Sequence, residues 1–357
     1  MTSTQRTRFA AAAAVLVTAI SLSACGTPPE PPPAAPPPPP PAAPPPPPPV
    51  SLSSGVVEAA SAYEAYMARA GAISADFQSG VSVSQSLRAG ESYEPQQLMR
   101  GAIAYGAVAA LQDANFVANV RAFAADAGTR AQVTAAILKD PAYVVAIKGS
   151  DGAAGLVTAA LSDQGGRVLD AGTAVKQAAY QVQHQAWSLG TVPNRDQRLA
   201  EAKSLSMTAL LPPSEGVARL QQASIGMSPM PLTGAPKPPP YTPLVIRSLA
   251  VAALAALGQA GEENASLVAP LLSEPNTGYC LNMSKLNLYQ CLAVAKPYYE
   301  DVFCLGQHVL MDTGQCVVTA AGGPKPVMIA RATPVAPPPS PVSDKAPTRP
   351  KASKNKS

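Results

Sequence analysis

The sequence predicts a mostly α-helical protein: an irregular, Ala-rich helical bundle with a C-terminal disulfide-bridged helical hairpin, flanked by Pro-rich disordered segments. Three observations support this prediction. Ala, Leu and Gln recur while β-branched alternation is rare, apolar residues return at helical spacing between residues 51 and 320, and most of the 41 prolines gather in three blocks. No fixed repeat period separates the helices, so a bundle is favoured over a solenoid.

Composition excludes several classes of function. Charged residues make up 13% of the 357 residues, aromatic residues 5%, and the formal net charge is +4. Nucleic acid is not an expected partner because no basic face with interleaved aromatic residues is present. The chain has two histidines, which argues against a His-rich metal site. We therefore expect neither a metal nor another cofactor.

The N-terminus has the organisation of an export signal. Arg6 and Arg8 precede an apolar stretch at residues 9–22. This stretch has the length of a signal-peptide core and is shorter than the ~20 residues of a bilayer span. Residues 1–24 are therefore predicted to be a signal peptide.

The end of this segment, Leu22-Ser23-Ala24-Cys25, resembles the lipobox of bacterial lipoprotein precursors at all four positions. The resemblance implies cleavage before Cys25, a diacylglyceryl thioether on its sulfur and acylation of the new amino group. Two or three acyl chains would anchor the chain stably in a lipid bilayer. Gly26, where some families use Asp for inner-membrane retention, implies the outer membrane, facing the periplasm. The alternative is a plain secretory signal with a coincidental cysteine.

A proline spacer follows the lipidated cysteine, and together they form the segment 25–50. Residues 28–49 contain 17 prolines in 22 positions. Proline fixes φ and lacks a backbone donor, so the segment favours polyproline II with a reach of about 65–70 Å. We expect it to hold the following body away from the lipid surface. The alternative is a ligand for a domain that binds polyproline II.

Residues 51–227 form the first predicted helical domain. Ser54 is expected to cap a helix that runs to residue 70. The polar interval 74–94 follows, in which Val81 and Val83 alternate with serines as in a short extended piece. Pro95 then begins the next helix, because proline suits a first helical turn.

The rest of this domain is predicted from caps and breaks. Asp113 should cap a helix that Gly128 ends, and Thr129 should start another that Asp140-Pro141 interrupts. Asp151 should cap a short helix after a Gly-rich turn. A long helix is expected from about residue 166 to 187, and a last one between Pro193 and Pro212.

Residues 228–243 are predicted to be a Pro-rich linker, and residues 244–322 a second helical segment. The latter begins with LVIRSLAVAALAAL at residues 244–257. This run is too short for a bilayer span and contains Arg247, so a buried core helix is favoured.

Four cysteines remain besides Cys25, and in an oxidising exported compartment they are expected to form two disulfides. Residues 284–295 and 297–309 read as two helices broken at Lys296-Pro297. Folding them as a hairpin sets Cys291 opposite Cys304, and Cys280 opposite Cys316. We therefore predict these nested pairs. Sequential pairing, Cys280–Cys291 with Cys304–Cys316, is the alternative.

No catalytic or metal-binding pattern emerges. The cysteine spacings are too wide for zinc, even with His308, and a redox CxxC pair is missing. His184 has no nucleophile placed beside it. The adjacent acids at 262–263 and 300–301 point about 100° apart on a helix, and those at 300–301 simply favour its positive end. Tyr298, Tyr299 and Phe303 have the spacing of hairpin core residues. No catalytic residue is therefore predicted.

The tail, residues 323–357, is predicted to be disordered, Pro-rich and basic. It contains seven Lys and Arg residues and one acid, Asp344. We expect either a solvated end or a segment attracted to an anionic surface such as phospholipid, wall polymer or an acidic protein.

These features together predict a non-enzymatic envelope lipoprotein that acts as a membrane-anchored structural or interaction module in the periplasm. Its expected partners are the lipid bilayer, through acylated Cys25, and an envelope protein or anionic envelope polymer. The alternative is an envelope enzyme, or a protein that binds small ligands or cell wall, whose site the sequence does not reveal.

Overall fold

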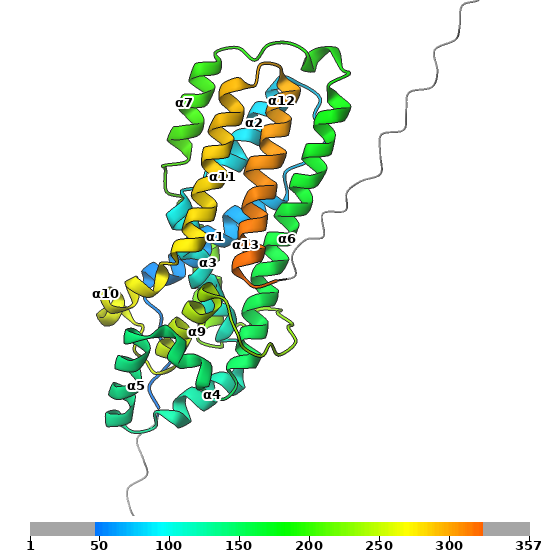
Figure 1. The fold of residues 1–357 in the computed structure, drawn as a ribbon. Helices are drawn as coiled ribbons and strands as arrows, with labels where there is room; N and C mark the ends of the chain where they lie inside the picture. The colour runs from blue at the N-terminus through cyan, green and yellow to red at the C-terminus, as the bar shows by residue number, and fades with distance from the viewer. Residues whose placement is uncertain (1–46, 324–357) are drawn as a thin grey trace, which may run out of the picture. The chain divides into compact units, whose positions relative to one another are not determined.

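The computed structural model describes residues 47–323 (Figure 1). The predicted signal peptide, Cys25, most of the proline spacer and the basic tail lie outside the described residues. Within residues 47–323 the protein is helical and forms no strand beyond two isolated β-bridges. The mostly α prediction and the C-terminal disulfide hairpin are confirmed.

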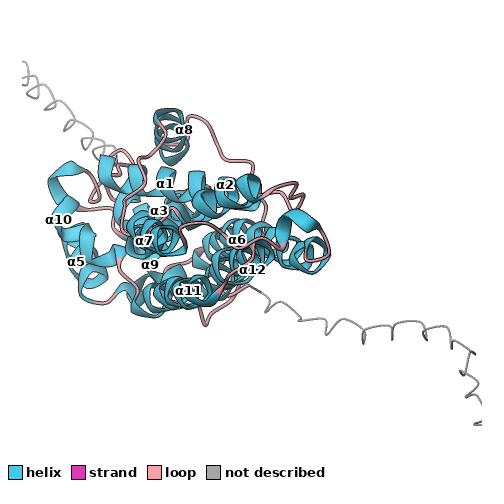
Figure 2. Ribbon diagram, turned by 90° about the horizontal axis from the view of Figure 1, so that it is seen from above, coloured by secondary structure: helices cyan, strands magenta, loops and turns pink. Residues whose placement is uncertain are grey.

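Two predicted helices form the first layer of the core. Helix α1 (Ser54–Gly71) has Ser53 as its N-cap residue and not Ser54, which was the predicted cap. Helix α3 (Pro95–Ala110) begins at its proline, as predicted. Nearly every residue of α3 is buried, because the helix lies among α1, α6 and α9 (Figure 2). Small side chains permit this: a Cβ on Gly101 would lie 2.6 Å from the Ala59 carbonyl oxygen.

The interval between these helices was predicted wrongly. Residues 80–91 form helix α2 (Gly80–Glu91) and not an extended piece. Ser79 and Ser82 close a capping box, which supplies the start signal. Val83 and Leu87, four residues apart, are buried while Val81 is 67% exposed. Helical periodicity therefore prevails over the local alternation with serine.

Helix α4 (Ala114–Phe123) begins as predicted, because the Asp113 side chain accepts a hydrogen bond from the Phe116 amide at 2.9 Å. It ends at Phe123, before Gly128, which was the predicted end. Asp126 caps the next helix, α5 (Ala127–Lys139), through the Thr129 amide at 2.9 Å. A second capping aspartate thus places Gly128 inside a first helical turn. A 3₁₀ helix, Pro141–Ala146, follows the predicted break.

Helix α6 (Ser150–Val182) is one helix of 33 residues where the sequence predicts two. Its N-cap is Gly149, with φ of 88°, and the predicted cap Asp151 lies in the first turn. The Gly165-Gly166 pair does not break it. A Cβ on Gly165 would lie 3.0 Å from the Gly314 carbonyl oxygen, so this glycine serves close helix packing. Trp187 lies beyond α6 in a separate 3₁₀ turn, Ala186–Ser188.

Two short helices complete the first predicted domain. Helix α7 (Arg195–Leu205) was expected, although it stops earlier than predicted. Helix α8 (Ser214–Ser224) was not expected; it lies at the outside beside α1 (Figure 2).

The predicted linker, residues 228–243, lies on the helical body. Met230 and Tyr241 are buried, and the Lys237 amide donates to the Asp151 carbonyl oxygen at 2.9 Å. Helix α9 (Pro243–Ala256) is almost wholly buried, as predicted for a core helix, and packs on α3. The helices on both sides of residues 228–243 thus share one core. Nowhere in residues 47–323 is a helix both long and apolar enough to span a bilayer.

The C-terminal hairpin is longer than predicted. After a short turn of helix, α10 (Ala265–Val268), helix α11 (Pro275–Val294) forms its first arm. The second arm runs without a break through α12 (Tyr298–Cys304), a π-helical turn (Leu305–Met311) and α13 (Asp312–Ala320). The turn lies at Lys296-Pro297, as predicted.

The four cysteines of the hairpin are joined in the nested arrangement. Cys280 is bonded to Cys316 with a Cα–Cα distance of 5.8 Å, and Cys291 to Cys304 with 5.7 Å. The second arm packs along α6, where Gly172 and Gly306 allow close approach of the two backbones.

Candidate functional site

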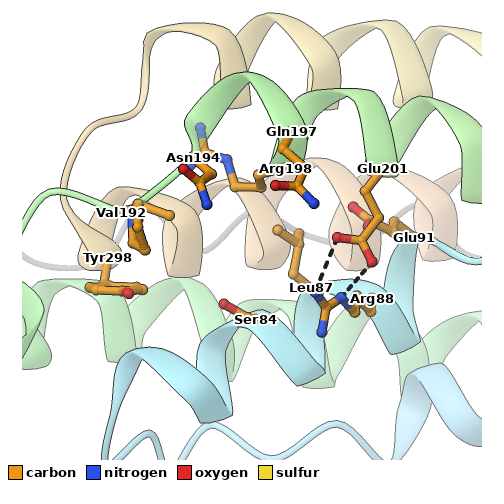
Figure 3. A pocket seen from close by; sticks show the side chains of 11 residues that line it. Ser84, Leu87, Arg88, Glu91, Val192, Asn194, Gln197, Arg198, Glu201 and Tyr298 are labelled. Carbon is orange, nitrogen blue, oxygen red and sulfur yellow. Dashed lines mark hydrogen bonds and ion pairs between the residues drawn. The ribbon is translucent and has the colours of Figure 1, made fainter.

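A polar cleft lies between α2 and α7, next to the turn of the hairpin (Figure 3). Its cavity has a volume of about 270 Å³. Helix α2 contributes one wall, α7 with the loop before it contributes the other, and one residue of α12 closes the end. The lining side chains are Ser84, Leu87, Arg88, Glu91, Val192, Pro193, Asn194, Gln197, Arg198, Glu201 and Tyr298.

Helix α7 is fixed by hydrogen bonds to the hairpin turn. Arg195 donates from Nε to the Ala295 carbonyl oxygen at 2.7 Å and from Nη2 to the Ala293 carbonyl oxygen at 2.9 Å. The Val192 amide donates to the Lys296 carbonyl oxygen at 2.8 Å. These contacts hold the second wall of the cleft to the hairpin turn.

Two ion pairs line the cleft. At its mouth the Arg88 guanidinium binds both carboxylate oxygens of Glu201, at 2.7 and 3.1 Å, and both side chains are partly exposed (Figure 3). Deeper in, Arg198 pairs with Asp301 and also donates to the Leu292 carbonyl oxygen. Burial raises the pKa of Asp301 to about 6, and the Arg198 charge offsets part of that rise.

Glu91 is the unusual group of the cleft. It is 2% exposed, it forms no ion pair with any described residue, and its Oε2 atom has no hydrogen-bond partner. Burial raises the pKa of Glu91 to about 8, which the charge of Lys285 partly opposes. At neutral pH the folded protein therefore holds this carboxyl largely in its protonated form.

Lys285 lies behind Glu91 and is also buried. Its ammonium group donates to the Glu91 main-chain carbonyl oxygen and lies 3.4 Å from the centroid of the Tyr93 ring. Burial holds the pKa of Lys285 well below its usual value, and the Glu91 charge acts in the opposite direction. Lys285 thus supports the end of α2 and leaves the Glu91 carboxyl to the cleft.

The cleft is lined by hydrogen-bonding groups of several kinds. The lining hydroxyls, Ser84 and Tyr298, have no general base in hydrogen-bond contact among the described residues. No cluster of three His, Cys, Asp or Glu residues suited to a metal ion occurs between residues 47 and 323. The groups that are present can donate and accept hydrogen bonds.

A second cavity, of about 490 Å³, lies between the C-terminal end of α6 and the hairpin turn. It is mostly apolar and aromatic, and the inner disulfide forms part of its wall. Tyr180 is 51% exposed and Val294 is 74% exposed at its rim. The lining residues are Ala179, Tyr180, Gln183, Cys291, Val294, Ala295, Tyr299, Glu300, Phe303 and Cys304.

The structure separates the residues that the sequence singled out. His184 is exposed beyond the end of α6. Glu262 accepts a hydrogen bond from the Ser54 amide, so it bonds the start of α1, 208 positions away in the chain. Glu300 accepts from the Lys296 amide at 2.7 Å, whereas its neighbour Asp301 turns inward to the cleft's buried pair.

The predicted aromatic core of the hairpin is divided between two sites. Tyr298 lines the polar cleft, and Tyr299 and Phe303 line the apolar cavity. His308, weighed as a lone zinc ligand, accepts or donates a hydrogen bond with Asp312 at 2.9 Å. Sequence reasoning missed Glu91, Arg198 and Lys285, because their partners lie far away along the chain.

Comparisons with known proteins add no relative: no protein family, curated protein or solved structure matches the chain.

Proposed function

We propose that this chain is a lipid-anchored envelope protein that acts as an interaction module, presenting the turn of its disulfide hairpin to a partner protein. The lipobox-like sequence ending at Cys25 and the proline spacer supply the anchor and the reach. Cys25 and most of the spacer lie outside the described residues, so the helical body supports only where the chain enters it and where its exposed faces lie.

The chain enters the body at one end of α6. The Pro48 carbonyl oxygen accepts a hydrogen bond from Arg121 of α4 at 3.0 Å, and the Ser51 amide donates to the Ala255 carbonyl oxygen at 3.2 Å. Helix α4 packs beside the first turns of α6, at the lower end in Figure 1. An anchored spacer would therefore attach the body at this end.

The hairpin turn lies at the other end of α6. Residues Ala179 and Gln183, at the end of this helix, border the apolar cavity together with α11 and α12. Because α6 has 33 residues, its two ends lie about 50 Å apart. This separation is the observation that carries the proposal: the apolar cavity, with Tyr180 and Val294 exposed at its rim, lies at the end of α6 remote from Pro48, where the chain enters the body.

The chemistry of that end favours a protein as the partner over an anionic polymer. The cavity wall is formed mainly by rings, aliphatic groups and a disulfide, and its one acid is Glu300. Aromatic residues beside a pocket are the usual anchors of protein interfaces. The basic tail remains available as a separate contact with an anionic surface.

The test combines anchoring with crosslinking. Membrane fractionation and the mass of the mature N-terminus should give an acylated Cys25, and Cys25→Ser should leave an unprocessed or soluble chain. A photo-crosslinking residue at Val294 should give one discrete envelope adduct. The same residue at Phe123, which is 51% exposed on α4, is the matched control and should not.

The two halves of the proposal fail separately. An unmodified N-terminus in the wild type would remove the anchor without touching the interaction face. Adducts from Phe123 and none from Val294 would remove the hairpin turn as the interaction face while the anchor stands.

A further inference from the structure

The polar cleft between α2 and α7 contains two buried groups that the protein itself leaves unsatisfied. The first is the Glu91 carboxyl, whose neighbours are engaged elsewhere: Arg88 binds Glu201, and Lys285 binds a main-chain carbonyl oxygen. Glu91 Oε2 consequently has no partner although the residue is 2% exposed. Buried polar groups in native proteins are normally hydrogen-bonded, so each exception requires an explanation.

The second unsatisfied group is a donor on the opposite wall. The terminal nitrogens of Arg198 bind Asp301 and the Leu292 carbonyl oxygen, but its Nε atom is buried without a partner. The cleft thus combines an unpaired carboxyl and an unpaired guanidinium nitrogen. A hydroxyl group both donates and accepts, so one chemical class complements both.

The remaining lining fits the same class. Asn194 and Gln197 present exposed amides, and Ser84 and Tyr298 present hydroxyls. Both arginines of the lining already face carboxylates, so the cleft offers no unmatched cation to an anionic ligand. Leu87 and Val192 supply small apolar surfaces between the polar groups. Such alternation suits a ring that carries several hydroxyls on an otherwise apolar frame.

We propose that the cleft between α2 and α7 binds a small, neutral, polyhydroxylated ligand with the size of about one sugar ring. The cavity volume of about 270 Å³ lies just below the roughly 300–1,000 Å³ of common ligand pockets, which limits the occupant to a small molecule or the end of a longer one. This binding activity goes beyond the proposed function, because the cleft is distinct from the apolar cavity at the hairpin turn.

The first experiment measures binding to the full-length purified chain. The single tryptophan, Trp187, has its ring centroid 6.5 Å from that of Tyr298, which lines the cleft, so its fluorescence reports on occupancy. Glucose and N-acetylglucosamine should each change this fluorescence saturably. Gln197→Ala removes an exposed amide of the lining and should weaken binding about tenfold, the effect of one good hydrogen bond. Gln181→Ala, on the exposed face of α6, is the matched control and should change nothing.

A second set of variants tests the class of ligand. Glu91→Gln keeps a group that donates and accepts, so sugar binding should persist, whereas Glu91→Leu should abolish it. Methylammonium serves as the cationic probe. Binding of methylammonium that Glu91→Gln abolishes would overturn the assignment of a neutral ligand. Failure of both sugars to bind, or sugar affinity that is unaffected by Gln197→Ala and Glu91→Leu, would overturn the site.

The same chemistry has two sources, a free sugar and the end of a glycan chain. A trisaccharide of N-acetylglucosamine separates them. Affinity equal to or above that of the monosaccharide supports a glycan end, and loss of affinity supports a free sugar as the occupant.

Discussion

Lys285 of α11 donates a hydrogen bond to the main-chain carbonyl oxygen of Glu91, the last residue of α2. The two residues are 194 positions apart, and both are buried. This carbonyl lies at a helix end, where intrahelical partners run out, and it also accepts a hydrogen bond from the Tyr93 amide at 2.9 Å. The hydrogen bond from Lys285 connects α2 to the disulfide hairpin, and α2 is the one described helix for which the sequence predicted an extended piece. The main-chain carbonyl of Glu91 is thus hydrogen-bonded, whereas Oε2 of its carboxyl has no hydrogen-bond partner.

The raised pKa of Glu91 predicts a pH-dependent stability difference. The unfolded carboxyl loses its proton near its ordinary pKa of 4.5, but the folded one retains it up to about pH 8. The folded state therefore binds more protons between these values, and this stabilisation is lost as the pH rises. Lys285, whose pKa is lowered, opposes the trend in the wild type.

Comparison with Glu91→Gln isolates the effect of the carboxyl, because Lys285 is present in both proteins. We expect the smallest difference in the free energy of unfolding below pH 4.5, and an advantage of the glutamine variant that grows from there towards pH 8. The limit is about 1.4 kcal/mol per pH unit. Urea unfolding at several pH values measures it. A difference that is flat between pH 5 and 8 would show that Glu91 titrates normally.

The buried pair of Arg198 and Asp301 should be far more important for stability than the exposed pair at the cleft mouth. Arg198→Met leaves Asp301 buried without its cation and removes the side-chain donor of the Leu292 carbonyl oxygen. We expect a loss of about 3–5 kcal/mol, as is usual when one partner of a buried ion pair is removed. Arg88→Met is the matched control and should cost much less, because solvent screens the exposed pair. Similar losses for both variants in urea unfolding would contradict this ranking.

The two disulfides should be detected by non-reducing peptide mapping as Cys280–Cys316 and Cys291–Cys304. Loop-closure entropy makes the outer bridge the stronger contributor, because it spans 36 residues and the inner one spans 13. We expect losses of about 3.8 kcal/mol for the Cys280→Ser, Cys316→Ser double variant and about 2.9 kcal/mol for the inner pair. A Cys280–Cys291 peptide would refute the nested arrangement.

Two adjacent glycines of α6 should respond oppositely to alanine. A Cβ on Gly165 would meet Val318 at 2.9 Å and the Gly314 carbonyl oxygen at 3.0 Å, whereas one on Gly166 meets nothing within 4 Å. Gly165→Ala should destabilise the protein by about 1–3 kcal/mol through overpacking. Gly166→Ala should stabilise it by about 0.5–1 kcal/mol, because glycine is a poor helix former. Thermal unfolding of both variants tests the α6–α13 contact, and a gain for both would place these helices further apart.

Local signals made part of the fold predictable. The buried helix α9 followed from the length of its apolar run, and α3 and α4 followed from a proline and a capping aspartate. The hairpin followed from the symmetry of its cysteines about Lys296-Pro297. Each of these signals lies within a few turns of the element that it specifies.

The errors arose where tertiary contacts decide. The serines around Val81 suggested extended chain because the burial of Val83 and Leu87 could not be foreseen. Helix α6 was divided at a glycine pair whose purpose depends on Gly314, about 150 residues further along the chain. The cleft could not be predicted for the same reason. Arg198 and Asp301 are 103 positions apart, and no sequence signal near either residue indicates that they pair.

The outer disulfide also determines how this protein would carry mechanical load. If the chain is held at its N-terminal end and pulled at its C-terminal end, tension passes directly from Cys280 to Cys316 through the sulfur bridge. The residues between them, including the whole hairpin turn, then bear no tension. Under load the polypeptide would be shorter by about 120 Å than its residue number implies, since each bypassed residue would otherwise extend by about 3.3–3.6 Å. Reduction of this one bond would release that hidden length.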